Sequence, residues 1–126
     1  MRTILFAFLM LGIAPCIHAQ ELLSSTRYEC EQIQKKSPIT CAPKLEEGKY
    51  TLIINAKLKL EITKEETKLI QYLVSVLTEN FLARGGYSVE QHALFGDGRH
   101  NSRWCHLSKR INKIWCNPWE PVEAEK

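Results

Sequence analysis

Apolar and polar residues largely alternate from Tyr50 to Ile62: seven of the apolar side chains fall on one parity, and of the other parity only Ile53 is apolar. A period of two over this length is typical of extended backbone that buries one face and exposes the other. Two structures fit the pattern: one long strand, or a hairpin that turns near Asn55. A hairpin would need a three-residue loop to keep the apolar face intact, and the glycine that such loops usually carry is missing. The sequence leaves both alternatives open.

A long helix is predicted directly after this segment, over residues 64–84. Thr63 and Glu66 have the spacing of a capping box, in which the threonine hydroxyl accepts from an exposed amide and the glutamate reaches back. Apolar residues then recur every three or four positions and form one stripe. Two glycines at 85 and 86 are typical of a helix end. We expect this stripe to pack on the apolar face of the preceding strand and to form the core with it.

The flanking segments carry weaker patterns. Residues 20–48 are polar, with a short helix predicted over 29–36 and a turn at 46–48. Ser88 and Gln91 could cap a short helix that runs to Phe95, and an extended strand over residues 87–94 fits almost as well. The last ten residues, 117–126, carry two prolines and three glutamates and are expected to form a flexible tail.

Residues 103–117 fit two structures that differ in their disulfide pairing. In a helix, Cys105 and Cys116 would lie about 16 Å apart along the axis and could not bond to each other. In a hairpin that turns at Arg110-Ile111, the two cysteines face each other across the strands. We favour the hairpin because it accounts for both the alternation of the side chains and the bond.

Four cysteines follow residue 20, in two pairs that each span eleven positions. Of the three connectivities that four cysteines allow, we predict the two local disulfides, Cys30–Cys41 and Cys105–Cys116. Each short loop would contribute about 2–3 kcal/mol to stability in the chain-entropy account. A zinc site would usually need more closely spaced cysteine pairs, so no metal is expected.

These elements predict an α+β fold for one small disulfide-stapled domain over residues 20–116. In this fold, an extended strand or hairpin (50–62) packs on one long helix (64–84), and a disulfide-bridged hairpin forms the C-terminal part of the domain.

The first nineteen residues, 1–19, have the pattern of a cleavable signal peptide. Arg2 gives a positive start, an apolar run extends from Ile4 to Ile13, and cleavage is expected after Ala19. The run is shorter than the ~20 residues that span a bilayer, so no transmembrane segment is expected after cleavage. Lipidation of Cys16 is an alternative. The leader predicts a periplasmic or secreted protein, whose remaining cysteines would be oxidised.

The charge balance limits the class of partner. The whole chain has a formal net charge of +3, and loss of Arg2 with the leader lowers it to +2. This small excess gives no broad positive field, and export argues further against nucleic acid. We therefore expect no nucleic-acid partner.

A basic and aromatic stretch from Arg99 to Trp119 is the best candidate for function, because it holds five cations and three tryptophans and no acid. Tryptophan and arginine most often anchor protein interfaces, although the same tryptophans could instead cover a small core. We predict a non-enzymatic protein that binds another envelope or extracellular protein, such as an inhibitor, an immunity protein or an accessory subunit of a secretion or transfer apparatus. The expected anchors are Trp104, Trp115, Arg103 and Arg110.

Two alternatives belong to other function classes. His92, His100 and His106 could transfer protons in a small nuclease-like hydrolase. The sequence contains no G-x-S-x-G, no H-E-x-x-H and no glycine-rich phosphate loop, so catalysis is not favoured and no cofactor is expected. The basic aromatic stretch could also bind anionic surface polymers or lipids.

Overall fold

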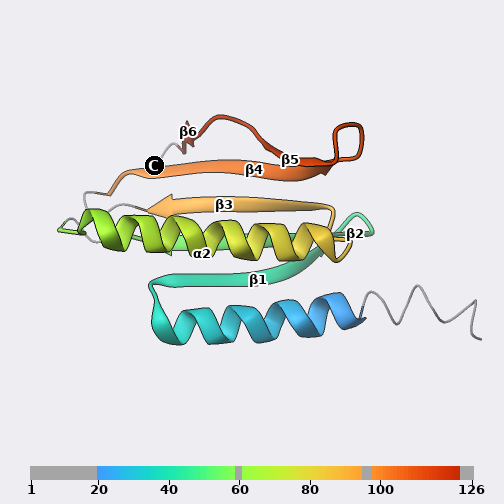
Figure 1. Cartoon of the computed structure of the whole chain (residues 1–126), viewed down its shortest axis with the longest axis horizontal. Coiled ribbons are helices and arrows are strands. Elements are labelled where there is room, and N and C mark those ends of the chain that lie inside the picture. The colour runs from blue at the N-terminus through green and yellow to red at the C-terminus, as the bar shows by residue number, and fades with distance from the viewer. Residues whose placement is uncertain (1–19, 59–60, 95–97, 123–126) are drawn as a thin grey trace, which may run out of the picture.

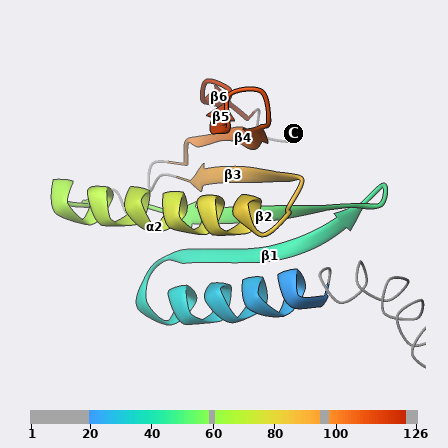
Figure 2. The ribbon, with the colours of Figure 1, turned by 45° about the vertical axis from the view of Figure 1, so that its right-hand side comes forward.

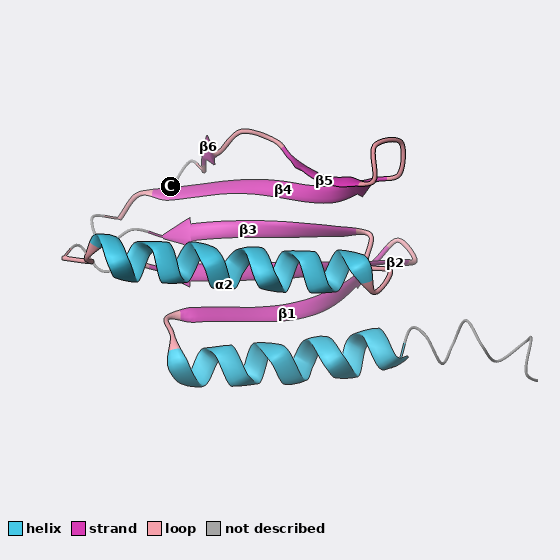
Figure 3. Ribbon diagram, viewed as in Figure 1, coloured by secondary structure: helices cyan, strands magenta, loops and turns pink. Residues whose placement is uncertain are grey.

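The computed structural model describes residues 20–58, 61–94 and 98–122, and these form two helices and a six-stranded mixed sheet (Figures 1 and 3). In chain order the elements are a helix over residues 20–36, β1 (Ile39–Glu46), β2 (Lys49–Lys57), α2 (Lys64–Ala83), β3 (Ser88–Leu94), β4 (His100–Ser108), β5 (Lys113–Cys116) and β6 (Glu120–Pro121). The helix over residues 20–36 is called the N-terminal helix below.

The strands lie in the order β1-β2-β3-β4-β5, and β6 pairs with β4. Every pairing is antiparallel except the one between β2 and β3, which is parallel. Parallel neighbours cannot be joined by a tight turn, and α2 supplies the crossover between them. The predicted α+β class is confirmed.

The core lies between α2 and the apolar face of the sheet. Leu52 and Ile54 of β2 are fully buried, and they belong to one cluster with Phe81 and Leu77 of α2 and with Val89 of β3. The alternation that predicts the strand thus selects the face that packs on the helix. The predicted Thr63 cap is present as well, because its hydroxyl accepts from the Glu66 amide at 3.1 Å, and the Glu66 carboxylate reaches back to that hydroxyl at 3.2 Å.

The segment with alternating apolar and polar residues forms a single strand, β2. This strand ends at Lys57, although the alternation continues to Ile62. Asn55 lies inside β2, paired with β1 on one side and β3 on the other, so the chain does not turn there. The Leu58 amide donates to the carbonyl of Leu94, the last residue of β3, at 2.7 Å. Leu94 is the last residue of β3 before the undescribed residues 95–97, and residue 61 lies in a turn. Residues 59–60 lie outside the described part.

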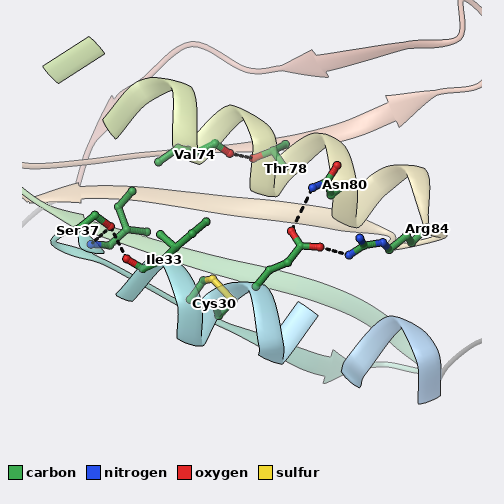
Figure 4. The surroundings of a disulfide bond; sticks show 10 residues. Cys30, Ile33, Ser37, Val74, Thr78, Asn80 and Arg84 are labelled. Carbon is green, nitrogen blue, oxygen red and sulfur yellow. Dashed lines mark hydrogen bonds and ion pairs between the residues drawn. A yellow bond between two sulfur atoms is a disulfide. The ribbon is translucent and has the colours of Figure 1, made fainter. Parts of the chain in front are cut away.

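The N-terminal helix is longer than the short helix predicted over 29–36. Its buried residues recur at helical spacing, at Leu22, Thr26 and Cys30. The Glu29 carboxylate accepts from Asn80 of α2 at 3.1 Å and also pairs with Arg84 just beyond that helix (Figure 4). The two helices are therefore linked to each other as well as to the sheet.

Both helices pack on the same face of the sheet. Leu22 and Cys30 of the N-terminal helix belong to the same core cluster as Leu52 and Phe81. In two views the N-terminal helix runs alongside β1, and α2 runs alongside β2 (Figures 1 and 2). Within the described residues, the opposite face of the sheet is left without a covering layer, and we call it the open face.

Both predicted disulfides are present, Cys30–Cys41 and Cys105–Cys116. The first ties the N-terminal helix to β1, and the second joins β4 to β5 in the predicted hairpin. The short helix predicted from Ser88 towards Phe95 is wrong and the extended alternative is correct, because Ser88–Leu94 form the strand β3. Its alternate buried residues, Val89 and Gln91, face α2.

Part of the segment predicted to be a flexible tail pairs with the sheet. Glu120 and Pro121 form β6 opposite Ser102 and Asn101, and the Val122 amide donates to the His100 carbonyl at 2.8 Å. The short β5 leaves this part of β4 unpaired on its outer edge, so the backbone groups there can accept a further strand.

The signal peptide predicted for residues 1–19 lies outside the described residues, and so does Cys16. In the part of the chain that the structure describes, neither helix combines the length and the apolarity needed to cross a membrane. The two disulfides fit a protein that matures in an oxidising compartment, as extracellular and periplasmic proteins do.

Candidate functional site: an aromatic cluster on the open face

Strand parity places three aromatic side chains on the open face. Val89 faces Cys105 on the helix-covered side of the sheet, where both are fully buried. Because successive side chains point to opposite faces, the neighbours of Cys105 in β4, Trp104 and His106, point to the open face. The register of β4 and β5 then places Trp115 directly opposite His106.

These three residues, Trp104, His106 and Trp115, pack against one another, and we call them the aromatic cluster. The rings of Trp104 and His106 stack with centroids 5.4 Å apart, and Trp115 meets Trp104 edge-on at 5.7 Å and His106 at 5.5 Å. Trp104 and Trp115 nevertheless remain 47% and 45% exposed. A contact of three rings that is still half open to solvent is typical of a binding surface more than of a core.

The second disulfide fixes the geometry of this cluster. Cys105 and Cys116 each lie next to a tryptophan in sequence, and the bond between them locks β4 against β5 in one register. Nδ1 of His106 is buried and has no hydrogen-bond partner within the described residues.

A hollow of about 920 Å³ adjoins the cluster. The Lys49 ammonium lies over the Tyr87 ring there, 4.3 Å from its centroid, and Lys109 adds a second cation. The two lysines outnumber the one acid of the lining, Glu90, so the hollow can receive an acidic group beside Trp104. Its lining comes from the start of β2, the end of α2 and the β3 and β4 strands: Gly48, Lys49, Tyr50, Leu82, Gly85, Gly86, Tyr87, Ser88, Glu90, Trp104, His106, Leu107 and Lys109.

The structure separates the four residues that the sequence proposes as anchors. Trp104 and Trp115 lie together in the aromatic cluster. Arg110 lies exposed in the turn between β4 and β5. Arg103 lies neither in the aromatic cluster nor in this turn. It is paired with Gln91 and points to the helix-covered face of the sheet. Adjacent residues of a strand point to opposite sides, so Arg103 and Trp104 cannot contact one partner surface together.

Arg103 has its own surroundings behind the sheet. Its Nε donates to the Gln91 amide oxygen at 2.7 Å, and its guanidinium lies over the Trp119 ring, 4.6 Å from the centroid. Burial lowers the pKa of Arg103 because it removes water from the cation. An arginine still keeps its proton at neutral pH.

The three histidines form a pair and a separate member of the aromatic cluster. Nδ1 of His92 lies 3.0 Å from Nε2 of His100, and Nε2 of His92 lies 3.5 Å from a carboxylate oxygen of Glu90. His106 belongs to the aromatic cluster and is separated from the pair along β4 by Ser102 and Trp104. Among the described residues, no group of three or more such side chains is arranged to hold a metal ion.

Sequence reasoning misses two features of this domain. The hollow beside the aromatic cluster depends on how the start of β2 meets the end of α2, which are far apart in sequence. The second feature is the pair of hydrogen bonds that the buried Gln91 side chain makes with Thr78 and Arg103. The sequence gives one signal of these bonds: Gln91 is polar but lies two positions from Val89 in β3, on the same buried face of the strand.

Comparison with protein-family models, with curated proteins and with solved structures finds no match to this chain. The assignment of function therefore rests on the geometry of the open face and of the helix-covered side.

Proposed function

We propose that this protein is a small exported, non-enzymatic binding protein that docks another envelope or extracellular protein on its open face. The observation that carries the proposal is the contact of Trp104 with Trp115 on an uncovered sheet face, with both rings about half exposed. Tryptophans that remain accessible while they are held rigidly are the residues that most often dominate the energy of an interface. An inhibitor, an immunity protein or an accessory subunit of a secretion or transfer apparatus would use such a surface.

The charges around the cluster indicate an acidic partner surface. Lys49 and Lys109 line the hollow, and Arg110 and Lys113 lie at the tip of the β4–β5 hairpin and beside it. Cations at the edge of an apolar centre mainly raise the association rate and select partners of opposite charge. We therefore expect carboxylates of the partner to surround the apolar groups that meet the tryptophans.

A photo-crosslinking residue at Lys113, beside the cluster, should capture the partner in the native compartment. The same residue at Tyr72, exposed on α2 on the other side of the sheet, should not capture it. Equal capture from both positions would contradict docking on the open face. Salt-sensitive retention on heparin without capture of a protein would instead indicate an anionic polymer as the ligand.

Replacement of both tryptophans by alanine (Trp104→Ala with Trp115→Ala) should weaken binding of the captured partner about 100-fold or more, because each hot-spot side chain contributes about 2 kcal/mol. Titration calorimetry measures this loss, and thermal melting should change little. The matched control replaces Tyr28 and Tyr72, two aromatic residues of the helices that are each 64% exposed. Their double alanine variant should bind like the native protein. Unfolding of the tryptophan variant would show that these rings belong to the core.

One observation favours a second function, a small hydrolase. The Glu90–His92–His100 contacts give a histidine whose two ring nitrogens each lie near another polar group, as an acid–base residue needs. If this pair is catalytic, the native protein should cleave a single-stranded RNA probe, and the His92→Gln with His100→Gln variant should lose at least about 100-fold in rate. His106→Gln is the matched control. Absence of cleavage by the native protein removes this candidate.

A further inference from the structure

A second cavity, of about 440 Å³, lies on the helix-covered side of the sheet, between α2 and strands β2 to β4. Its volume falls within the roughly 300–1,000 Å³ that small-molecule sites occupy. Most of its wall is apolar and comes from the side chains of Ile54, Ala56, Leu58, Ile70, Val74 and Ala93. The cavity therefore has the size and the lining to hold the body of a small organic ligand.

Arg103 forms part of the wall of this cavity and is held there by a chain of hydrogen bonds whose central member is buried. Its Nε donates to the Gln91 amide oxygen, and the Gln91 amide nitrogen donates to the Thr78 hydroxyl at 2.9 Å. Gln91 and Thr78 are each only 2% exposed. The Thr78 hydroxyl donates in turn to the Val74 carbonyl at 2.8 Å (Figure 4). The guanidinium is thus positioned before any ligand arrives, which reduces the entropy cost of binding.

The charge of Arg103 has no counter-ion in the described residues. Its contacts are with the Gln91 amide and the Trp119 ring, and no carboxylate pairs with it. Among the described residues no side chain accepts from the two terminal nitrogens of the guanidinium, which can therefore bind another acceptor. A partly buried cation is costly unless an anion compensates for the lost water. A carboxylate fits best, because the planar fork of a guanidinium matches its two oxygens.

We infer that this cavity binds a small apolar monocarboxylate, whose carboxylate pairs with Arg103 and whose aliphatic or aromatic body lies against the apolar wall. The wall includes no lysine and no second arginine, so one negative charge matches it better than the two of a phosphate. Two sources share this chemistry: a free short-chain acid and the C-terminal carboxylate of a peptide. The inference does not depend on the proposed function, because the aromatic cluster lies on the other face of the sheet.

Titration of the mature, oxidised protein with sodium octanoate and with octanamide tests the inference. Calorimetry gives the two affinities, and the NMR signals of the Arg103 Nε–H and the Gln91 side-chain amide report the location. We expect octanoate to bind about 10-fold or more tightly than octanamide, since a charged hydrogen bond replaces a neutral one. An N-acetylated dipeptide that ends in leucine, compared with its amide, distinguishes a peptide C-terminus from a free acid.

The Arg103→Met variant should lose about 10-fold or more in affinity for octanoate and bind octanamide like the native protein. Arg110→Met, which removes an exposed cation from the hairpin turn, is the matched control and should bind octanoate normally. Equal binding of acid and amide by the native protein would overturn the inference. So would unchanged octanoate binding by Arg103→Met, or no binding of either acid. Should Arg103→Met fail to fold, the comparison of acid and amide on the native protein still decides.

Discussion

Replacing Gly86 by alanine should lower the free energy of unfolding by about 3 kcal/mol, the upper end of the usual cost of overpacking. The Gly85 and Gly86 amides donate to the Leu82 and Phe81 carbonyls, which closes the end of α2 in a Schellman motif. A Cβ atom on Gly86 would lie 2.2 Å from the ring atom Cε2 of Phe81. Phe81 is buried in the core, so its ring cannot move away without disturbing its neighbours. Urea denaturation of the oxidised protein measures the effect.

Two further variants separate the clash from the conformation of the backbone. Gly85 has a φ of +104° but open space around its missing side chain, so Gly85→Ala should cost only about 1 kcal/mol. Phe81→Leu removes the ring that causes the clash. Combined with Gly86→Ala, it should cost clearly less than the sum of the two single changes. Additive costs would show that the close approach to Phe81 does not explain the glycine.

The central part of the fold is predictable from local patterns. Period-two alternation identifies β2, and the capping box at Thr63 and the two glycines at 85 and 86 bound α2 to within a residue or two. These signals are strong because each depends only on neighbouring residues and on backbone hydrogen bonds. The end of β2 at Lys57 is different, since it depends on where β3 ends, and the apolar alternation continues past it.

The N-terminal third is harder to predict, because its apolar residues are few. The buried stripe of the N-terminal helix includes Thr26 and Cys30, so its amphipathic pattern is weak in sequence. The following strand, β1, contains Pro43, which usually argues against a strand. β1 is the edge of the sheet and pairs only with β2, so one side of the strand needs no donor. Tertiary packing decides the structure of both elements.

The candidate site also has one part that the sequence predicts and one part that it does not. The parity of a hairpin predicts that Trp104 and Trp115 share a face, and the structure brings them together. The same parity sends Arg103 behind the sheet, where it contacts Gln91 and lies near α2. A run of basic and aromatic residues in sequence therefore becomes two separate sites. Which groups meet Arg103 depends on the register of β3 with β4, which places Gln91 opposite it, and on the packing of α2, and no local signal encodes either.

The two disulfides offer a matched test of how the fold supports the site. Both close loops of the same length, with a sequence separation of eleven, and each joins one buried cysteine to one that is partly exposed. Replacement of either pair by alanine should therefore lower the free energy of unfolding by a similar amount, about 3 kcal/mol in the chain-entropy account. Urea denaturation of the two double variants checks this equality.

The two variants should differ in function, because only the Cys105–Cys116 bond joins the strands that carry the aromatic cluster. Without it, Trp115 is free to move relative to Trp104 and His106, and binding must pay for ordering them. We expect the affinity for the open-face partner to fall on the order of 10-fold in Cys105→Ala with Cys116→Ala. The Cys30→Ala with Cys41→Ala variant should keep its affinity under conditions where it is folded. Acrylamide quenching of tryptophan fluorescence should rise in the first variant alone. Equal losses of affinity in both would mean that the bond beneath the cluster stabilises the domain without positioning its binding surface.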